Sequence, residues 1–199
     1  MPLRLLVALL LVSSAAASAE IPKERGSVIF FHPDGAGAGT WAAARMLYVG
    51  PDDDLEWDLL PHIAVYRGHQ SDNLTASSNG GATSHAYGVK VKRSAFGRTE
   101  AGPNGFEPVD QEGRSLSVAK QAIAAGLPGG LVQSGSAVEP GTAVFVSSVN
   151  ARADYEEIVD KLVHSGAAVM FSGGEEWFLP EGTQGLYTQG KRTDGRDLL

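Results

Sequence analysis

Hydrophobic residues recur along the chain in short runs that are separated by polar, glycine-rich segments. Continuous apolar runs of this length are typical of strands buried on both faces of a sheet. We predict such strands at Val28–Phe31, Ile63–Tyr66, Gly130–Val132 and Ala167–Phe171. Elsewhere the apolar residues follow the wider spacing of an amphipathic helix. Helices are predicted at Thr40–Tyr48, Ser115–Gly126, Pro140–Ser147 and Tyr155–His164.

Strand and helix patterns therefore alternate along the chain. This alternation predicts an α/β fold with a layered central, largely parallel sheet flanked by helices. The final residues, 191–199, read as the start of a helix that has no stop signal. We therefore expect the sequence to be truncated.

The first 19 residues have the pattern of a secretory signal peptide. Arg4 precedes an apolar run, Leu5–Val12, and small residues follow up to an A-x-A-like cleavage site at Ala17–Ala19. The apolar run is too short to span a bilayer. We therefore predict a leader at residues 1–19 and one domain at 20–199, exported to the periplasm or secreted.

Composition narrows the range of partners and of chemistries. A net charge of -7 argues against nucleic acid and acidic membrane surfaces as partners. Hydrophobic residues at 43% and charged residues at 20% indicate a globular protein. Cysteine is absent, which excludes disulfides and thiolate zinc sites. Any metal must therefore bind carboxylates, imidazoles or hydroxyls.

Ser78 is the first candidate for chemistry. It stands before Asn79–Gly81, and Ala82–Tyr87 reads as a helical turn. Backbone N–H groups at a helix start attract negative charge, which suits a nucleophilic serine and its substrate. The alternative is an N-cap serine followed by glycines in a loop.

Asp34 is the second candidate. It lies in the polar, glycine-rich loop His32–Gly39, directly after the first predicted strand. Open α/β sheets place their binding sites at this end of a strand, so Asp34 is either a metal ligand or a capping residue. A dinucleotide site fits less well, because the third glycine of G-x-G-x-x-G falls on Thr40.

Taken in order, these motifs resemble the alkaline phosphatase family. The matching pieces are Pro33–Gly35, Ser77–Ser84, Tyr87–Lys90, Glu139–Thr142, Val149–Arg152 and Phe171–Gly174. The resemblance implies the N-terminal half of a secreted, bacterial-type phosphatase that hydrolyses phosphate monoesters through a phosphoserine. It also implies two Zn²⁺ ions, one Mg²⁺ ion and a possible homodimer.

The resemblance assigns roles to five residues. Ser78 would be the nucleophile and a metal ligand, and Arg152 would bind phosphate. Asp34 would bridge a zinc and the magnesium, Thr142 would bind magnesium, and Glu139 would be a nearby or occasional direct metal ligand. For Arg152, the alternative is a cation that interacts with a helix C-terminus.

Several positions depart from the family pattern. Ser77 replaces the usual aspartate before the nucleophile, which would remove an anchor for the arginine. Strict counting puts the magnesium-ligand threonine at Gly141, and an insertion of one residue moves it to Thr142, which has the hydroxyl that a hard cation needs. The family carries its remaining zinc ligands in the second half of a longer chain. His62 and His69 lie near no carboxylate–histidine motif, and His164 lies on a predicted amphipathic helix, so two zinc sites cannot be assembled from this sequence.

Three alternatives remain open. A related phosphodiesterase, or another metal-dependent hydrolase, would use a similar serine. Sulfatases fit less well, because the segment after Ser78 lacks their C/S-x-P-x-R arrangement. A noncatalytic, secreted anion-binding module would need no complete metal site. The chain could also be a fragment that does not fold alone, because its sheet would leave strands unpaired.

Overall fold

The computed structural model of the protein describes residues 26–199. Contacts between residues divide the chain into two units, residues 1–31 and residues 32–199. The predicted signal peptide lies outside the described residues. Within residues 26–199, no helix has both the length and the apolar character needed to cross a bilayer.

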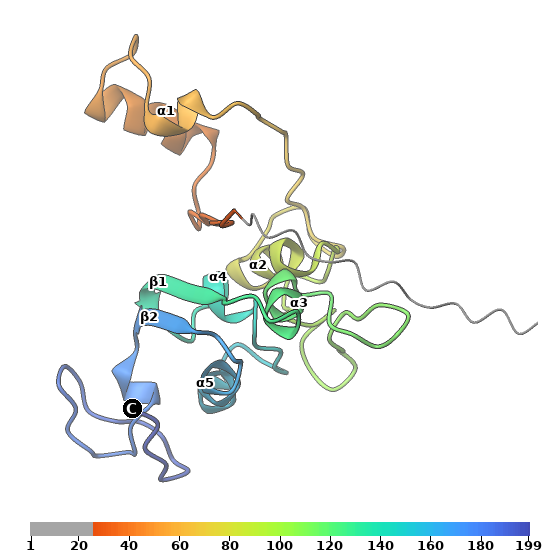
Figure 1. Cartoon of the computed structure of the whole chain (residues 1–199), viewed down its shortest axis with the longest axis vertical. Coiled ribbons are helices and arrows are strands. Elements are labelled where there is room, and N and C mark those ends of the chain that lie inside the picture. Colours follow the sequence, from red (N-terminus) through yellow and green to blue (C-terminus); the bar gives the residue numbers. More distant parts are fainter. Residues whose placement is uncertain (1–25) are drawn as a thin grey trace, which may run out of the picture. The chain divides into compact units, whose positions relative to one another are not determined.

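The described helices and strands all fall within residues 32–199 (Figure 1). In chain order they are α1 (Ala38–Tyr48), η1 (Glu56–Leu59), α2 (Ser78–Tyr87), α3 (Val118–Ala124), β1 (Gly130–Ser136), α4 (Pro140–Ala143), α5 (Tyr155–Val163), β2 (Val169–Gly173) and η2 (Glu175–Trp177). The two elements marked η are short 3₁₀ helices.

β1 and β2 form a parallel pair, as the alternating pattern predicted. Gly130 pairs with Val169 and Val132 with Phe171, and the register shifts further along β1. Parallel neighbours need a long crossover connection, and here that connection contains α4 and α5. The predicted parallel sheet with flanking helices is therefore confirmed.

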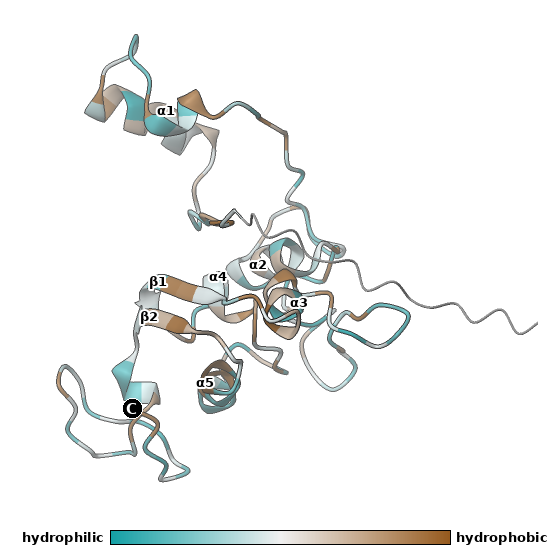
Figure 2. Ribbon diagram, in the orientation of Figure 1, coloured by the Kyte–Doolittle hydropathy of each residue, from teal (hydrophilic) through white to brown (hydrophobic). Residues whose placement is uncertain are grey.

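The hydrophobic core includes one face of α5 and the segment around α4. Ile158, Val159 and Leu162 of α5 are buried, whereas Val163 is 37% exposed. At about 100° per residue, Val163 lies past Val159 at the edge of the buried face, and it is the last residue of the helix. Figure 2 shows the corresponding contrast of hydrophobic and hydrophilic colour on α5.

Glu107 holds α2 and α3 together. Its Oε1 accepts hydrogen bonds from the Tyr87 hydroxyl at 3.3 Å and the Lys120 ammonium at 2.7 Å, and also from Ser115. Burial, and next the charge of Glu107, raise the pKa of the Tyr87 hydroxyl. Tyr87 is the last residue of α2, so this network fixes the C-terminal end of the helix that carries Ser78.

Two of the predicted strands are wrong. Val28–Phe31 and Ile63–Tyr66 have no strand assignment, and Ile63 and Val65 are 100% and 95% exposed. An apolar run indicates that a segment can be buried. A strand also requires a neighbouring strand that shares its backbone hydrogen bonds. Neither run pairs with β1 or β2, the strands of the described sheet.

Two helix predictions also need correction. The helix expected at Pro140–Ser147 ends at Ala143, and the apolar residues that follow are buried in turns. The final segment, residues 191–199, is not helical.

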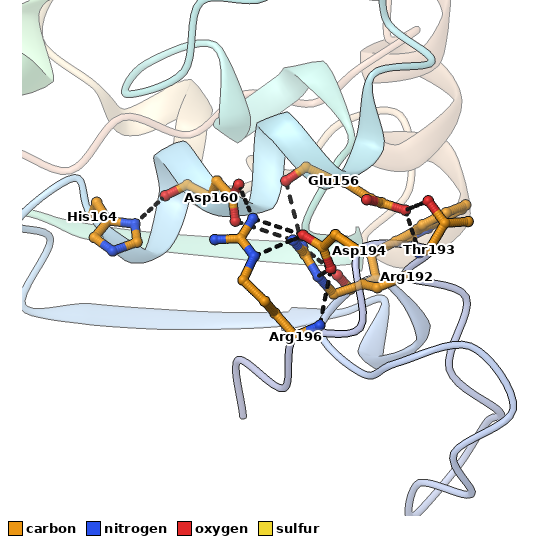
Figure 3. Close-up of polar contacts among 8 residues, drawn as sticks. Glu156, Asp160, His164, Arg192, Thr193, Asp194 and Arg196 are labelled. Atoms are coloured by element: carbon orange, nitrogen blue, oxygen red, sulfur yellow. Dashed lines mark hydrogen bonds and ion pairs between the residues drawn. The ribbon is translucent and has the colours of Figure 1, made fainter.

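The last segment is held against α5 by charged side chains (Figure 3). Arg192 is fully buried and forms ion pairs with Asp160 of α5 and with Asp194. Its Nη1 also donates to the backbone oxygen of Trp177 at 3.1 Å. Arg196 pairs with the same two aspartates from a position that is 48% exposed.

Candidate functional site

α2 begins one residue after Ser77, which acts as its N-cap. The Ser77 Oγ accepts a hydrogen bond from the backbone N–H of Gly80 at 3.1 Å and donates one to the backbone oxygen of Arg93 at 2.5 Å. Ser78 is therefore the first helical residue, and the helix starts four residues earlier than the predicted turn at Ala82. Half-buried Ser78 lies where backbone N–H groups lack helical acceptors.

The two glycines of α2 have different surroundings. A Cβ at Gly80 would lie 2.5 Å from Gln70 Oε1 and 2.8 Å from the backbone oxygen of Lys92. A Cβ at Gly81 would lie 3.8 Å from the Ala76 Cβ, an ordinary contact. Gly80 therefore allows close packing of α2 against Gln70 and the backbone of Lys92.

Arg152 is brought to the start of α2 from 73 residues away. Its Nη1 donates to Asn79 Oδ1 at 3.4 Å, and its Nη2 forms an ion pair with Glu139 Oε2. The Arg152 and Glu139 side chains are each 42% exposed. A guanidinium thus contacts Asn79, the residue after Ser78, near a helix N-terminus, where both the charge and the backbone dipoles favour an anion.

Packing between two short helices supports this arrangement. α2 contacts α4, and Glu139 is the residue directly before α4. Pro140 at the first position of α4 is favourable because it has no N–H to leave unsatisfied. Glu139 reaches Arg152 from this fixed start.

Within residues 26–199, no hydrogen bond or ion pair joins Asp34 or Thr142 to Ser78. Asp34 is exposed and has no hydrogen bond or ion pair to other residues in the described range. Thr142 lies near Leu131 of β1 and Met170 of β2. The segment carrying Asp34 does approach α4, because His32 Nδ1 lies 3.3 Å from the backbone oxygen of Gly141.

The described residues do not by themselves fit the expected zinc and magnesium centre. Within residues 26–199, no group of three or more His, Asp or Glu side chains could hold a metal ion. Asp34, Ser78, Thr142 and Glu139 each have an oxygen donor that suits a hard cation. Their metal roles stay predictions.

His85 is an α2 residue that the sequence did not single out. Its ring lies 4.8 Å from the His32 ring and 4.9 Å from the Tyr66 ring, measured between centroids. Burial, and next the charge of His32, lower the pKa of His85.

Sequence reasoning also missed the role of Asn79 and the pairing of Glu139. The sequence indicated no role for Asn79, and the family resemblance made Glu139 a nearby or occasional direct metal ligand. No spacing rule connects position 79 or 139 with position 152, because the contact depends on how α2 packs against α4. The only signal in the sequence for Asn79 was its position directly after Ser78, the candidate nucleophile.

Comparison with known proteins gives a consistent picture. The family model described as Alkaline phosphatase matches residues 26–199. A curated alkaline phosphatase of Gadus morhua is 25% identical over 210 residues, which cover 87% of this chain and 42% of the relative. The chain therefore spans less than half the length of that relative.

Solved structures agree with the family match. The alkaline phosphatase of the Antarctic bacterium TAB5 superposes with a TM-score of 0.63 at 21% identity, over 83% of this chain and 41% of its own. A variant of that enzyme with Mg bound in its M3 site has the same TM-score and identity, over 82% of this chain and 40% of its own. At these identities the likeness establishes the fold.

Proposed function

Since this chain belongs to the alkaline phosphatase family, we propose that it carries the nucleophile and the phosphate-binding arginine of a metal-dependent phosphatase. The proposed reaction is hydrolysis of phosphate monoesters through a phosphoserine on Ser78. Because the chain covers 42% of the curated relative, we assign this activity to a longer protein that contains it.

One observation carries the proposal: the Arg152 guanidinium lies beside Asn79, the residue that follows Ser78 at the start of α2. In the proposed reaction, the Ser78 oxygen forms a bond to phosphorus as the bond to the leaving oxygen breaks. Water then cleaves the phosphoserine and releases phosphate. Arg152 binds phosphate oxygens as a planar fork, and the N–H groups of α2 add favourable dipoles.

Metal ions belong to this proposal on the basis of the family. The TAB5 variant binds Mg, and we propose magnesium and two zinc ions for the longer protein. Asp34, Ser78, Thr142 and Glu139 would supply oxygen donors. The other ligands would come from outside residues 26–199, because the described residues hold no metal-binding group of three.

Export and assembly are further parts of the proposal. The leader-like pattern at residues 1–19 supports transport to the periplasm or the medium. Small phosphate monoesters are the proposed ligands, and a homodimer is the proposed assembly.

Replacing Ser78 tests the assignment. In the longer protein, Ser78→Ala should abolish both the phosphoenzyme, detected by mass spectrometry after acid quenching, and turnover of a phosphate monoester. Ser77→Ala is the matched control, because it removes the N-cap but not the nucleophile. It should cost about 1 kcal/mol of stability and still form phosphoenzyme.

The same measurements separate the alternatives. Phosphoenzyme in Ser78→Ala would refute the nucleophile assignment. Faster turnover of diesters than of monoesters would favour a phosphodiesterase. Phosphate binding without turnover, in protein supplied with zinc and magnesium, would favour a noncatalytic anion-binding module.

A further inference from the structure

We propose that Glu139 and Asn79 are positioning residues that hold the Arg152 guanidinium at the start of α2. This inference rests on the proposed function, in which Arg152 binds phosphate. It gives Glu139 a role beyond metal binding, and it gives Asn79 a role that no sequence motif assigns.

The contacts use both terminal nitrogens of the arginine. Nη1 donates to Asn79 and Nη2 donates to Glu139, so the guanidinium plane is fixed at two points. A guanidinium has more N–H donors than these two contacts use, and the others remain for an anion. Two fixed points set the direction of a planar fork, which one contact would leave free to rotate.

The exposure of the Arg152 side chain explains why contacts with Glu139 and Asn79 are needed to hold it. The Arg152 side chain is 42% exposed, so packing alone does not confine its several rotatable bonds. Ordering a rotamer-rich side chain on binding costs free energy, and holding it in place beforehand reduces that cost. Glu139 and Asn79 therefore preorganise Arg152 for phosphate.

The contacts of Glu139 indicate that it holds Arg152 and does not cap α4. Glu139 precedes α4, but its side chain makes no capping hydrogen bond to that helix. Its carboxylate instead reaches Arg152, 13 residues away in sequence. Removing it should thus leave α4 intact while releasing the arginine.

Ser77 cannot provide the same anchor. Its hydroxyl is committed to the cap of α2 and to the backbone of Arg93. The family resemblance placed an aspartate there as an anchor, and the described contacts place a carboxylate near Arg152 from position 139. The carboxylate that anchors Arg152 therefore comes from Glu139 and not from position 77.

A double-mutant cycle in the longer protein tests the proposal. Binding of inorganic phosphate is measured by titration calorimetry for wild type, Glu139→Ala, Arg152→Ala and the double variant. Glu139→Ala should weaken binding about threefold to fivefold, the range expected for an exposed ion pair. In the Arg152→Ala background the same change should have no effect, because Glu139 acts through Arg152.

Two further variants sharpen the result. Asn79→Ala should weaken phosphate binding less than Glu139→Ala and should also lose its effect without Arg152. Glu139→Gln should recover part of the loss, because its amide oxygen still accepts a hydrogen bond. Glu157→Ala is the matched control: it removes a similarly exposed ion pair, with Lys161 on α5, and should leave phosphate binding unchanged.

Three outcomes would overturn the inference. An equal loss in the Arg152→Ala background, or lost metal on elemental analysis, would mean that Glu139 acts as an independent ligand. Tighter phosphate binding in Glu139→Ala would mean that the carboxylate competes with phosphate. No change would mean that the contact has no role. A protein that binds phosphate with the expected coupling but forms no phosphoenzyme would uphold this inference and refute the proposed function.

Discussion

Two arginines pair with carboxylates in this chain, and their surroundings differ. Arg152 is 42% exposed and makes one contact with Glu139 and one with Asn79. Arg192 is fully buried and bonds to Asp160, Asp194 and the backbone of Trp177. The first arginine keeps donors that a ligand can use, whereas the second is saturated by the protein.

This difference separates a binding arginine from a structural one. A buried charge is expensive unless it is paired and hydrogen-bonded, so every contact of Arg192 offsets its loss of water. An exposed pair such as Arg152–Glu139 adds little to stability. Substitutions at the two positions should therefore affect different properties of the protein.

The largest stability effect is expected at Arg192. Arg192→Leu should lower the free energy of unfolding by about 3 kcal/mol, because Asp160 and Asp194 would face each other with one cation fewer. Urea unfolding followed by circular dichroism measures this loss. Arg152→Leu should change stability by about 1 kcal/mol or less while weakening phosphate binding.

Arg196 provides the control for Arg192. It pairs with the same two aspartates but is 48% exposed. Arg196→Leu should therefore cost about 1 kcal/mol or less. Equal losses at Arg192 and Arg196 would contradict the view that burial makes the difference.

The two glycines of α2 allow a closely packed position to be compared with an open one within one helix. Gly80→Ala should destabilise by about 1 to 3 kcal/mol, because its Cβ would press on Gln70 and on the backbone of Lys92. Gly81→Ala should stabilise by about 1 kcal/mol, because alanine favours the helix and the space is open. Thermal unfolding of both variants measures the signs, and a gain in stability at Gly80 would show that α2 is not closely packed there.

The sequence predicted the local structure around Ser78, a helix start. Ser78 at a helix start followed from the small residues and glycines around it, although the helix begins earlier than expected. The contact of Arg152 with Asn79 could not be predicted, since it depends on packing between α2 and α4. Local signals place a residue on an element, and tertiary contacts decide what that residue faces.

The strand predictions show the same dependence on tertiary contacts. The apolar runs at Gly130–Val132 and Ala167–Phe171 are strands in β1 and β2 because each provides the other with a partner. Ile63–Tyr66 has a similar composition and is not a strand, since it has no partner in the described sheet. Arg192 in the core was equally unpredictable, because burial of a cation depends on the carboxylates packed around it.

The smallest effect should come from the pH dependence of the Arg192 cluster. The hydrogen bond from Arg192 is the main cause that holds the pKa of Asp194 below its usual range. The folded state therefore binds fewer protons than the unfolded state, whose aspartate pKa is about 3.9. The contribution of ionised Asp194 to the free energy of unfolding is complete above the pKa of the unfolded state. It is lost as the pH falls towards the lower pKa that Asp194 has in the folded state.

Asp194→Asn should accordingly reduce the loss of stability between neutral pH and about pH 3, measured by urea unfolding at each pH. Asp197→Asn is the control, because Asp197 accepts only a backbone hydrogen bond, from Leu199, among the described contacts. It should keep the wild-type pH dependence. If Asp194→Asn also kept it, the charge on Asp194 would not couple to folding, and the structural role assigned to Arg192 would rest on its other contacts.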